Sequence, residues 1–169
     1  TSMVVTNVGS GASEVMAMAI QTNGRIVVAG SSYLSEQSVF TVARYLSNGN
    51  LDSTFAGSGI SRVDVIGQNA WAQVVGVESQ GRIVTGGSVE YSGSRRALAF
   101  PRHTPSGGLD PSFGIQDPPY GDNSVASFNV VPGNDERLTG LVILPNGRYL
   151  ILGTTTSGNQ TDMMTGCFN

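Results

Sequence analysis

His103 and Cys167 are the residues of this chain that could supply a general base and a nucleophile. Each is the only residue of its type, so a metal site built from several histidines and a disulfide within the chain are both excluded. In the repeated pattern described below, the two residues hold nearly equivalent positions in different units, about one unit apart. We therefore expect no contact between them, and we predict a structural role for His103 within a strand and an inert thiol for Cys167.

Two aspartates, Asp52 and Asp110, recur after a leucine in glycine-rich turns. Recurring carboxylates could bind calcium, but neither turn has the D-x-D-x-D arrangement of a calcium loop. An aspartate in such a turn more often caps backbone N–H groups, which is the role we predict. Asp135 and Glu136 are adjacent, and neighbours on a strand point to opposite faces, so they are poorly placed for paired acid–base chemistry. The sequence therefore predicts no catalytic residue, no metal site and no cofactor, and a protein that is not an enzyme.

An arginine follows the turn of each repeated hairpin, at Arg25, Arg82 and Arg148. Three arginines at one end of the molecule could bind an anion or a sugar acid. The alternative is a solvated hairpin residue whose stem covers apolar surface, and we favour it because repeats copy structural positions. The three arginines are our first candidate ligand or interface residues.

Trp71 is the fourth candidate ligand or interface residue. It is the only tryptophan, and we expect it in a loop, as we do Tyr91 and Tyr120. Exposed aromatic side chains near Asn and Asp form platforms that bind carbohydrate. Because Trp71 precedes a predicted strand, packing in the core is an equally good interpretation.

Three stretches of the chain repeat one pattern, and they must position these residues. They read IQTNGRIVVAG at 20–30, VESQGRIVTGG at 77–87 and ILPNGRYLILG at 143–153. Each predicts an apolar strand, a tight turn with φ > 0 at its glycine, and a second apolar strand. Repeats of this length indicate one supersecondary unit that is copied and stacked. The side chains predicted to point inward from the first strands are Val15, Met18 and Ile20, then Val75 and Val77, then Leu141 and Ile143. The glycines predicted to end the second strands are Gly30, Gly87 and Gly153.

A third strand and a long turn extend the first two units. VFTVARYLSNGNLDSTF at 39–55 is matched by ALAFPRHTPSGGLDPSF at 97–113. The third unit offers DMMTGCFN at 162–169, in which Cys167 stands at the position of Arg44. The third unit therefore breaks the pattern and lacks the Leu-Asp turn.

A fourth strand closes the first two units, ISRVDVIG at 60–67 and VASFNVVPG at 125–133. SMVVTNVG at 2–9 holds the same place before the first hairpin, so we predict that it is a displaced closing strand. The chain is thus predicted to be a single repeat domain. The domain spans 1–169, and its units are 10–67, 68–133 and 134–169 with 2–9 as the closing strand.

These motifs resemble the delta-60 repeat family, whose pattern is a polar-Gly-Lys/Arg hairpin followed by IVVAG, ARY and G-x-L-D-x-x-F-G. The first unit matches at NGRIVVAG, 23–30, at ARY, 43–45, and at GNLDSTF, 49–55. The second matches at QGRIVTGG, 80–87, and at GGLDPSFG, 107–114. The third matches only at PNGRYLILG.

The resemblance implies an all-β fold of β-propeller-like blades, each of four antiparallel strands. About three blades fit this chain, with the N-terminal strand displaced from the last blade. The family also implies a place in large bacterial surface or secreted proteins, so we expect an extracellular or cell-surface location. It implies no single biochemical activity.

Composition argues against two kinds of partner. The net charge is −3, and the nine basic residues are all arginines that form no basic stripe, so we expect no binding to nucleic acid. No apolar run reaches the ~20 residues of a membrane-spanning helix, so we expect no membrane insertion. No signal peptide is visible at the N-terminus. Asn159-Gln160-Thr161 is a glycosylation sequon, predicted to lie in a surface loop.

Three blades are too few to close a ring, because propellers have about four to eight. We expect either flanking blades of a longer chain or a second copy that completes a six-bladed homodimer. The functional interpretation is a non-catalytic structural or protein-interaction element of a surface or secreted protein. The alternative is a carbohydrate-binding, lectin-like propeller, whose partner would be a glycan. An enzyme ranks third, because no nucleophile, base and orienting group occur together in the sequence.

Overall fold

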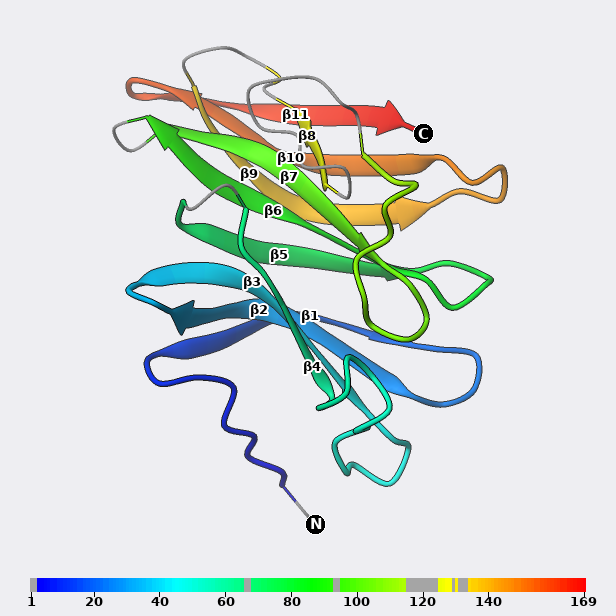
Figure 1. Cartoon of the computed structure of the whole chain (residues 1–169). Coiled ribbons are helices and arrows are strands. Elements are labelled where there is room, and N and C mark those ends of the chain that lie inside the picture. Colours follow the sequence, from blue (N-terminus) through cyan, green and yellow to red (C-terminus); the bar gives the residue numbers. More distant parts are fainter. Residues whose placement is uncertain (1–2, 66–67, 93–94, 115–124, 129, 131–133) are drawn as a thin grey trace.

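The chain folds into three antiparallel β-sheets that are stacked face to face (Figure 1). The computed structural model describes residues 3–65, 68–92, 95–114, 125–128, 130 and 134–169, with 91 and 92 described by their backbone only. These residues form eleven strands and no helix. In this part of the chain there is accordingly no helix that could cross a membrane. The all-β prediction is confirmed.

Each sheet is built from strands that follow one another along the chain. Sheet 1 has the order β1 (Ser13–Ile20), β2 (Ile26–Leu34), β3 (Gln37–Tyr45) and β4 (Ile60–Val63). Sheet 2 has the order β5 (Ala70–Val77), β6 (Ile83–Ser92), β7 (Arg95–His103) and β8 (Val125–Phe128). Sheet 3 has the order β9 (Asp135–Ile143), β10 (Tyr149–Ser157) and β11 (Gln160–Phe168). The predicted blade of four antiparallel strands is thus confirmed for sheets 1 and 2.

The repeated Gly-Arg turns are tight hairpins, as predicted. Gly24, Gly81 and Gly147 have φ of 80°, 80° and 82°, a region that glycine enters without steric cost. In the first hairpin the N–H of Gln21 donates to the carbonyl of Arg25 at 2.8 Å, and the equivalent bond recurs in the other two. These turns fix the register in which the first two strands of each sheet pair.

The glycine expected to end each second strand lies inside that strand instead. Gly30, Gly87 and Gly153 each face a β-bulge in the preceding strand. A Cβ at Gly30 would lie 1.9 Å from the carbonyl oxygen of Glu14, a distance that no side chain can occupy. The glycine is therefore required by the close approach of two backbones rather than by a turn.

Two hydrophobic cores lie between the three sheets. One joins sheets 1 and 2 through residues that include Phe40 and Ala72, and the other joins sheets 2 and 3 through residues that include Phe100 and Ile151. Sheet 2 is covered on both faces, which explains why consecutive residues are buried over 83–89 of β6 and 97–103 of β7.

The prediction of an inward face was wrong for the first strand of sheet 1. Val15, Met18 and Ile20 are 65%, 65% and 67% exposed, because β1 turns them to the outer side of the stack. The equivalent side chains of β5 and β9, among them Val75 and Leu141, pack against the neighbouring sheet as predicted.

Residues 3–12 form no strand, although the sequence predicted one over 2–9. They lie across the outer side of sheet 1, where the hydroxyl of Tyr45 donates to Thr6 Oγ1 at 2.8 Å and Arg62 Nε donates to the carbonyl of Val8 at 2.9 Å. Sheet 3, the sheet with three strands, is at the opposite end of the stack (Figure 1). Among the described residues, this segment therefore lies at the other end of the stack from β11, the strand whose free edge lacks a fourth strand.

Candidate functional site

A buried ion pair between an arginine and an aspartate occurs once in the unit of sheet 1 and once in the unit of sheet 2. In the first, Arg44 Nε lies 2.8 Å from Asp52 Oδ2, and both side chains are almost fully buried. The guanidinium stacks over the ring of Phe55 at 4.6 Å, and its Nη1 donates to the carbonyl of Pro105 at 2.6 Å. Pro105 belongs to the next unit, so this arginine joins two neighbouring units.

The second copy of the pair carries additional partners. Arg102 Nε donates to Asp110 Oδ2 at 2.9 Å, and the guanidinium lies 4.3 Å from the ring centre of Phe113. Arg102 Nη1 also donates to the hydroxyl of Tyr149 at 3.3 Å, and that hydroxyl donates to Glu78 Oε1 at 2.6 Å. Burial and the hydrogen bond to Glu78 raise the pKa of Tyr149, so the phenol stays protonated.

Both aspartates make the Asx turn that the sequence predicted. Asp52 Oδ1 accepts from the backbone N–H and the hydroxyl of Thr54, and Asp110 Oδ1 accepts from the same groups of Ser112. The Thr54 hydroxyl, with further help from Arg44, holds the pKa of Asp52 below its usual range. Burial acts to raise the pKa of Asp110, but the bonds from Ser112 and the charge of Arg102 outweigh it, and the pKa is lowered. The two carboxylates therefore stay ionised, and their oxygens are engaged by hydrogen bonds and ion pairs inside the protein.

The sequence analysis missed these ion pairs. The signal that could have revealed them is the joint recurrence of Arg44 with Asp52 and of Arg102 with Asp110, because the spacing within each pair is the same. Cys167 takes the arginine position in sheet 3 and is exposed.

The three candidate arginines are on hairpins along the same side of the stack, one in each sheet, but they make different contacts (Figure 1). Arg25 Nε lies 3.0 Å from Asp52 Oδ2, and Arg82 Nε donates to Glu78 at 2.7 Å. Arg148 is exposed, and its side chain makes no ion pair with any residue that the structure describes. The favoured interpretation, a solvated hairpin residue, and the alternative of a common anion site both stay predictions.

Trp71 lies within β5 rather than in a loop before it. The guanidinium of Arg96 stands over its ring at 4.7 Å, so this face of the indole is already occupied. A pocket of 160 Å³ beside the ring is lined by Trp71, Gln73 and Arg96 among others, which is below the ~300 Å³ of a typical small-molecule site. Tyr91 is also in a strand, β6, and Tyr120 lies outside the described residues.

His103 and Cys167 do not form a catalytic pair. His103 is fully buried in β7, and burial lowers its pKa to about 4. Neither ring nitrogen has a hydrogen-bond partner of normal geometry in the described part of the chain, so the imidazole is neutral. Cys167 is exposed on β11, in a different sheet. Asp135 and Glu136, at the start of β9, differ in burial as neighbours on a strand should: Asp135 is half-buried and Glu136 is fully buried.

Within the described residues, no three His, Cys, Asp or Glu side chains are placed to hold a metal ion. The larger polar pocket, 490 Å³, lies between sheets 2 and 3 and is lined by Glu78, Arg82, Arg102 and Tyr149 among others. These four groups contact one another, as the distances above show. Asn159, the sequon residue, lies in the turn between β10 and β11 and is exposed.

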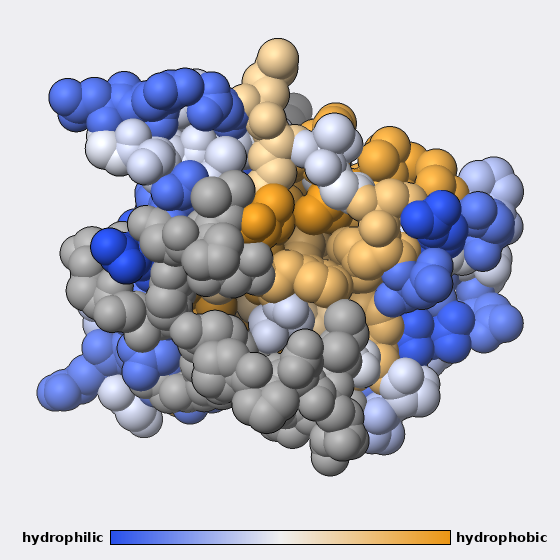
Figure 2. Space-filling view, turned by 90° about the horizontal axis from the view of Figure 1, so that it is seen from above, coloured by the Kyte–Doolittle hydropathy of each residue, from blue (hydrophilic) through white to orange (hydrophobic). Residues whose placement is uncertain are grey.

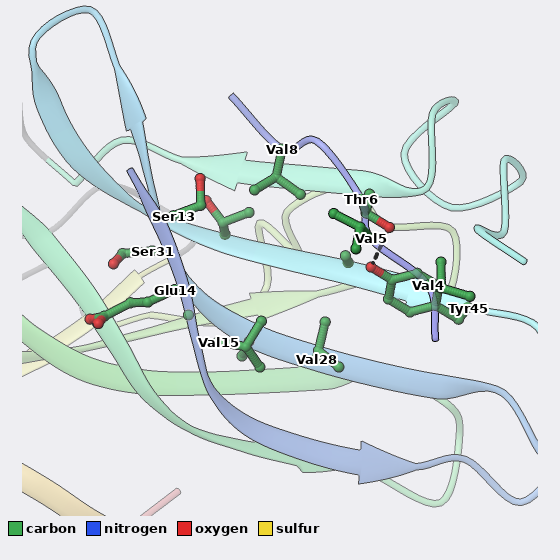
Figure 3. A pocket seen from close by; sticks show the side chains of 14 residues that line it. Val4, Val5, Thr6, Val8, Ser13, Glu14, Val15, Val28, Ser31 and Tyr45 are labelled. Carbon is green, nitrogen blue, oxygen red and sulfur yellow. Dashed lines mark hydrogen bonds between the residues drawn. The ribbon is translucent and has the colours of Figure 1, made fainter. Parts of the chain in front are cut away.

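The most apolar pocket lies on the outer side of sheet 1, under residues 4–8 (Figure 3). It has a volume of 280 Å³, and its walls include Val4, Val8, Val15 and Tyr45. Its residues come from the N-terminal segment and from β1, β2 and β3.

Comparison with known families gives one match that agrees with this geometry. A family described as a domain of unknown function (DUF5122) beta-propeller matches residues 21–55. The chain carries a β-propeller-like repeat. The matched stretch covers the turn after β1, the strands β2 and β3, and the ion pair between Arg44 and Asp52. No curated protein matches the chain significantly.

Proposed function

We propose that this chain is a non-catalytic β-propeller module, built from repeats of the delta-60 type, that acts as a structural or protein-interaction element of a surface or secreted protein. The observation that carries the proposal is the use of the recurring charged residues. The ion pairs of Arg44 with Asp52 and of Arg102 with Asp110 are buried within their units. Each arginine also donates to the next unit, Arg44 to the carbonyl of Pro105 and Arg102 to the hydroxyl of Tyr149. Side chains engaged in this way hold the stack together and are not available to bind or convert a substrate.

The exposed surface supports a partner that is a protein. Large apolar side chains are exposed at both ends of the stack, among them Val15 and Met18 on sheet 1 and Leu152 and Met163 on sheet 3. Extended apolar surface of this kind marks a protein interface more often than a glycan site. We propose that the partner is either flanking blades or a second copy, at an extracellular or cell-surface location, without nucleic acid and without membrane insertion.

A carbohydrate-binding propeller is the second candidate, and Trp71 is the observation in its favour. Its indole lines a pocket together with polar groups of Gln73 and Arg96. Sugar rings bind by stacking on an aromatic face, and Arg96 lies over a face of this indole. The lectin function therefore ranks below the interaction module.

The test compares binding to glycans with binding to proteins for the full chain. We expect no signal on a glycan array, and stoichiometric retention of a protein partner, either a tagged second copy of the chain or its flanking blades. A variant with Met18→Asp on the exposed face of sheet 1 should lose that partner, whereas Arg148→Ala on an exposed hairpin should keep it. Specific glycan binding that Trp71→Ala abolishes would contradict the proposal.

A further inference from the structure

Each sheet has two sides, and inside the stack one side of a sheet packs on the opposite side of the next. At the two ends of the stack, one side of each kind is exposed to solvent. We call the outer side of sheet 1, with Val15, Met18, Ile26, Val28 and Tyr45, the receiving face. We call the outer side of sheet 3, with Val142, Leu150, Leu152, Met163 and Thr165, the inserting face. Seen from above, the inserting face shows a patch of hydrophobic residues (Figure 2).

Strand register shows that the residues of the inserting face are equivalent, in the repeat, to residues that are buried in sheets 1 and 2. Val27 pairs with Arg44, Val84 pairs with Arg102, and Leu150 pairs with Cys167. Four residues before each of these β3, β7 and β11 positions stand Phe40, Leu98 and Met163. Phe40 and Leu98 are 0% exposed because the next sheet covers them, whereas Met163 is 96% exposed.

The residues of the receiving face are likewise equivalent to residues that are buried on the opposite side of sheets 2 and 3. The bulges align Val15 of β1 with Ala72 of β5 and Leu138 of β9. Ala72 and Leu138 are buried against the preceding sheet, whereas Val15 is exposed. Each internal junction thus joins an inserting side to a receiving side, and the described residues leave one side of each kind exposed.

We propose that the inserting face of one copy packs on the receiving face of a second copy, and the reverse, so that two chains complete a six-bladed ring. This inference rests on the proposed function and names its partner. Six blades lie within the about four to eight that close a propeller. A head-to-tail contact that closes after two copies gives a symmetric dimer with no open apolar face.

The N-terminal segment lies at the receiving face, which is the position that the closing strand of a preceding blade would take in such a ring. By the repeat, Val8 is equivalent to Val65, which is buried between sheets 1 and 2 just after β4. Val8 lines the pocket over the receiving face, held there by its bond from Arg62 (Figure 3). The pocket lies between this segment and β1 to β3, in the place that a sheet takes at each internal junction.

The register of β3 with β4 predicts how the segment pairs with the partner. Phe40 pairs with Val63 and Val42 pairs with Ser61. The equivalent pairs are Thr6 with the partner's Met163, and Val4 with the partner's Thr165. Residues 3–6 thus become the fourth strand of the partner's sheet 3, which has three strands of its own.

Side-chain volumes at the new junction are compatible with those at the first one. The core between sheets 1 and 2 combines a large inserting residue, Phe40, with a small receiving residue, Ala72. The proposed junction combines two residues of medium size, Met163 and Val15. Such a change keeps the total volume, which is the kind of change that cores accept.

Cysteine cross-linking tests the register directly. In a background with Cys167→Ser, one chain carries Thr6→Cys and a second chain carries Met163→Cys, and the two are mixed and oxidised. Directly opposed strand residues are within disulfide reach, so we expect a covalent dimer at twice the 17.6 kDa chain mass. Met3→Cys replaces Thr6→Cys as the control, because residue 3 is predicted to oppose Gly166, and it should give little dimer. Equal yields from both mixtures, or none from either, would overturn the register.

A surface substitution tests the contact without affecting the fold of one chain. Met163→Arg, at a side chain exposed in the single chain, should convert the dimer to a monomer by light scattering, and Met163→Leu should leave the dimer intact. A wild-type chain that is monomeric at all concentrations, or that forms larger open assemblies, would overturn the second copy as partner. A monomer that still captures a protein partner through Met18 leaves the proposed function standing, whereas glycan binding by an intact dimer contradicts only the proposed function.

Discussion

The buried imidazole of His103 predicts that the protein loses stability when the pH falls from 7 to 5. The unfolded chain has a histidine pKa near 6.5, and burial lowers the folded value to about 4. Between these two pH values the unfolded chain binds a proton at His103 and the folded chain does not. The contribution of the neutral imidazole to the free energy of unfolding is therefore fully present above pH 6.5 and is lost as the pH falls toward 4. The two pKa values give a loss of about 2 kcal/mol between pH 7 and pH 5.

The assay is urea unfolding at pH 7, 6 and 5 at one protein concentration, for the native chain and for His103→Phe. His103 is the only histidine, so few other groups titrate in this range. Phenylalanine keeps a ring beside Phe55, whose centre lies 6.3 Å from that of the imidazole, and it should remove the loss. Tyr45→Phe changes the equivalent position of sheet 1 and should keep the loss. The same pH dependence in His103→Phe as in the native chain would refute the reasoning.

Three further predictions concern stability and are measured by chemical or thermal unfolding. Arg44→Met should cost about 3 kcal/mol, because among the described residues it leaves the buried, ionised Asp52 with only the half-exposed Arg25 as a charged partner. Adding Asp52→Asn should recover part of the loss, and an unchanged stability of Arg44→Met would contradict the role of the ion pair. Gly30→Ala should cost about 3 kcal/mol, because the new Cβ would lie 1.9 Å from a backbone atom. Gly147→Ala, at a φ of 82° with no atom within 4 Å of the new Cβ, should cost about 1 kcal/mol. Equal losses would argue against the bulge as the cause. Arg148→Ala should change stability by less than about 0.5 kcal/mol, and a larger effect would reveal a contact that the structure does not show.

The sequence predicts the local elements of this protein well. The Asn-Gly turns and apolar periods locate the hairpins at Gly24 and Gly147, because turn chemistry and strand pairing depend on neighbouring residues. The recurrence of Asp52 and Asp110 in Leu-Asp turns predicts Asx capping for the same reason.

Features that depend on residues far apart in sequence are harder to predict. Gly30 is required by a bulge in another strand, and Trp71 belongs to β5 although the sequence predicted it in a loop. The exposure of Val15 is the clearest case: its apolar pattern is that of a buried face, and periodicity cannot show whether a neighbouring sheet is present in the same chain. The candidate site shows the same limit. The arginines that follow the turns were visible in the sequence, whereas the bonds of Arg44 to Pro105 and of Arg102 to Tyr149 depend on how one unit meets the next.

The central claim is that the open faces of sheets 1 and 3 are the two halves of one blade junction. A crystal structure of the full chain tests it most directly. The account predicts two chains in a closed ring of six sheets, with residues 3–6 paired antiparallel to β11 of the second copy and Met163 buried against Val15. A three-sheet stack in which Met163 and Val15 both face solvent would contradict it.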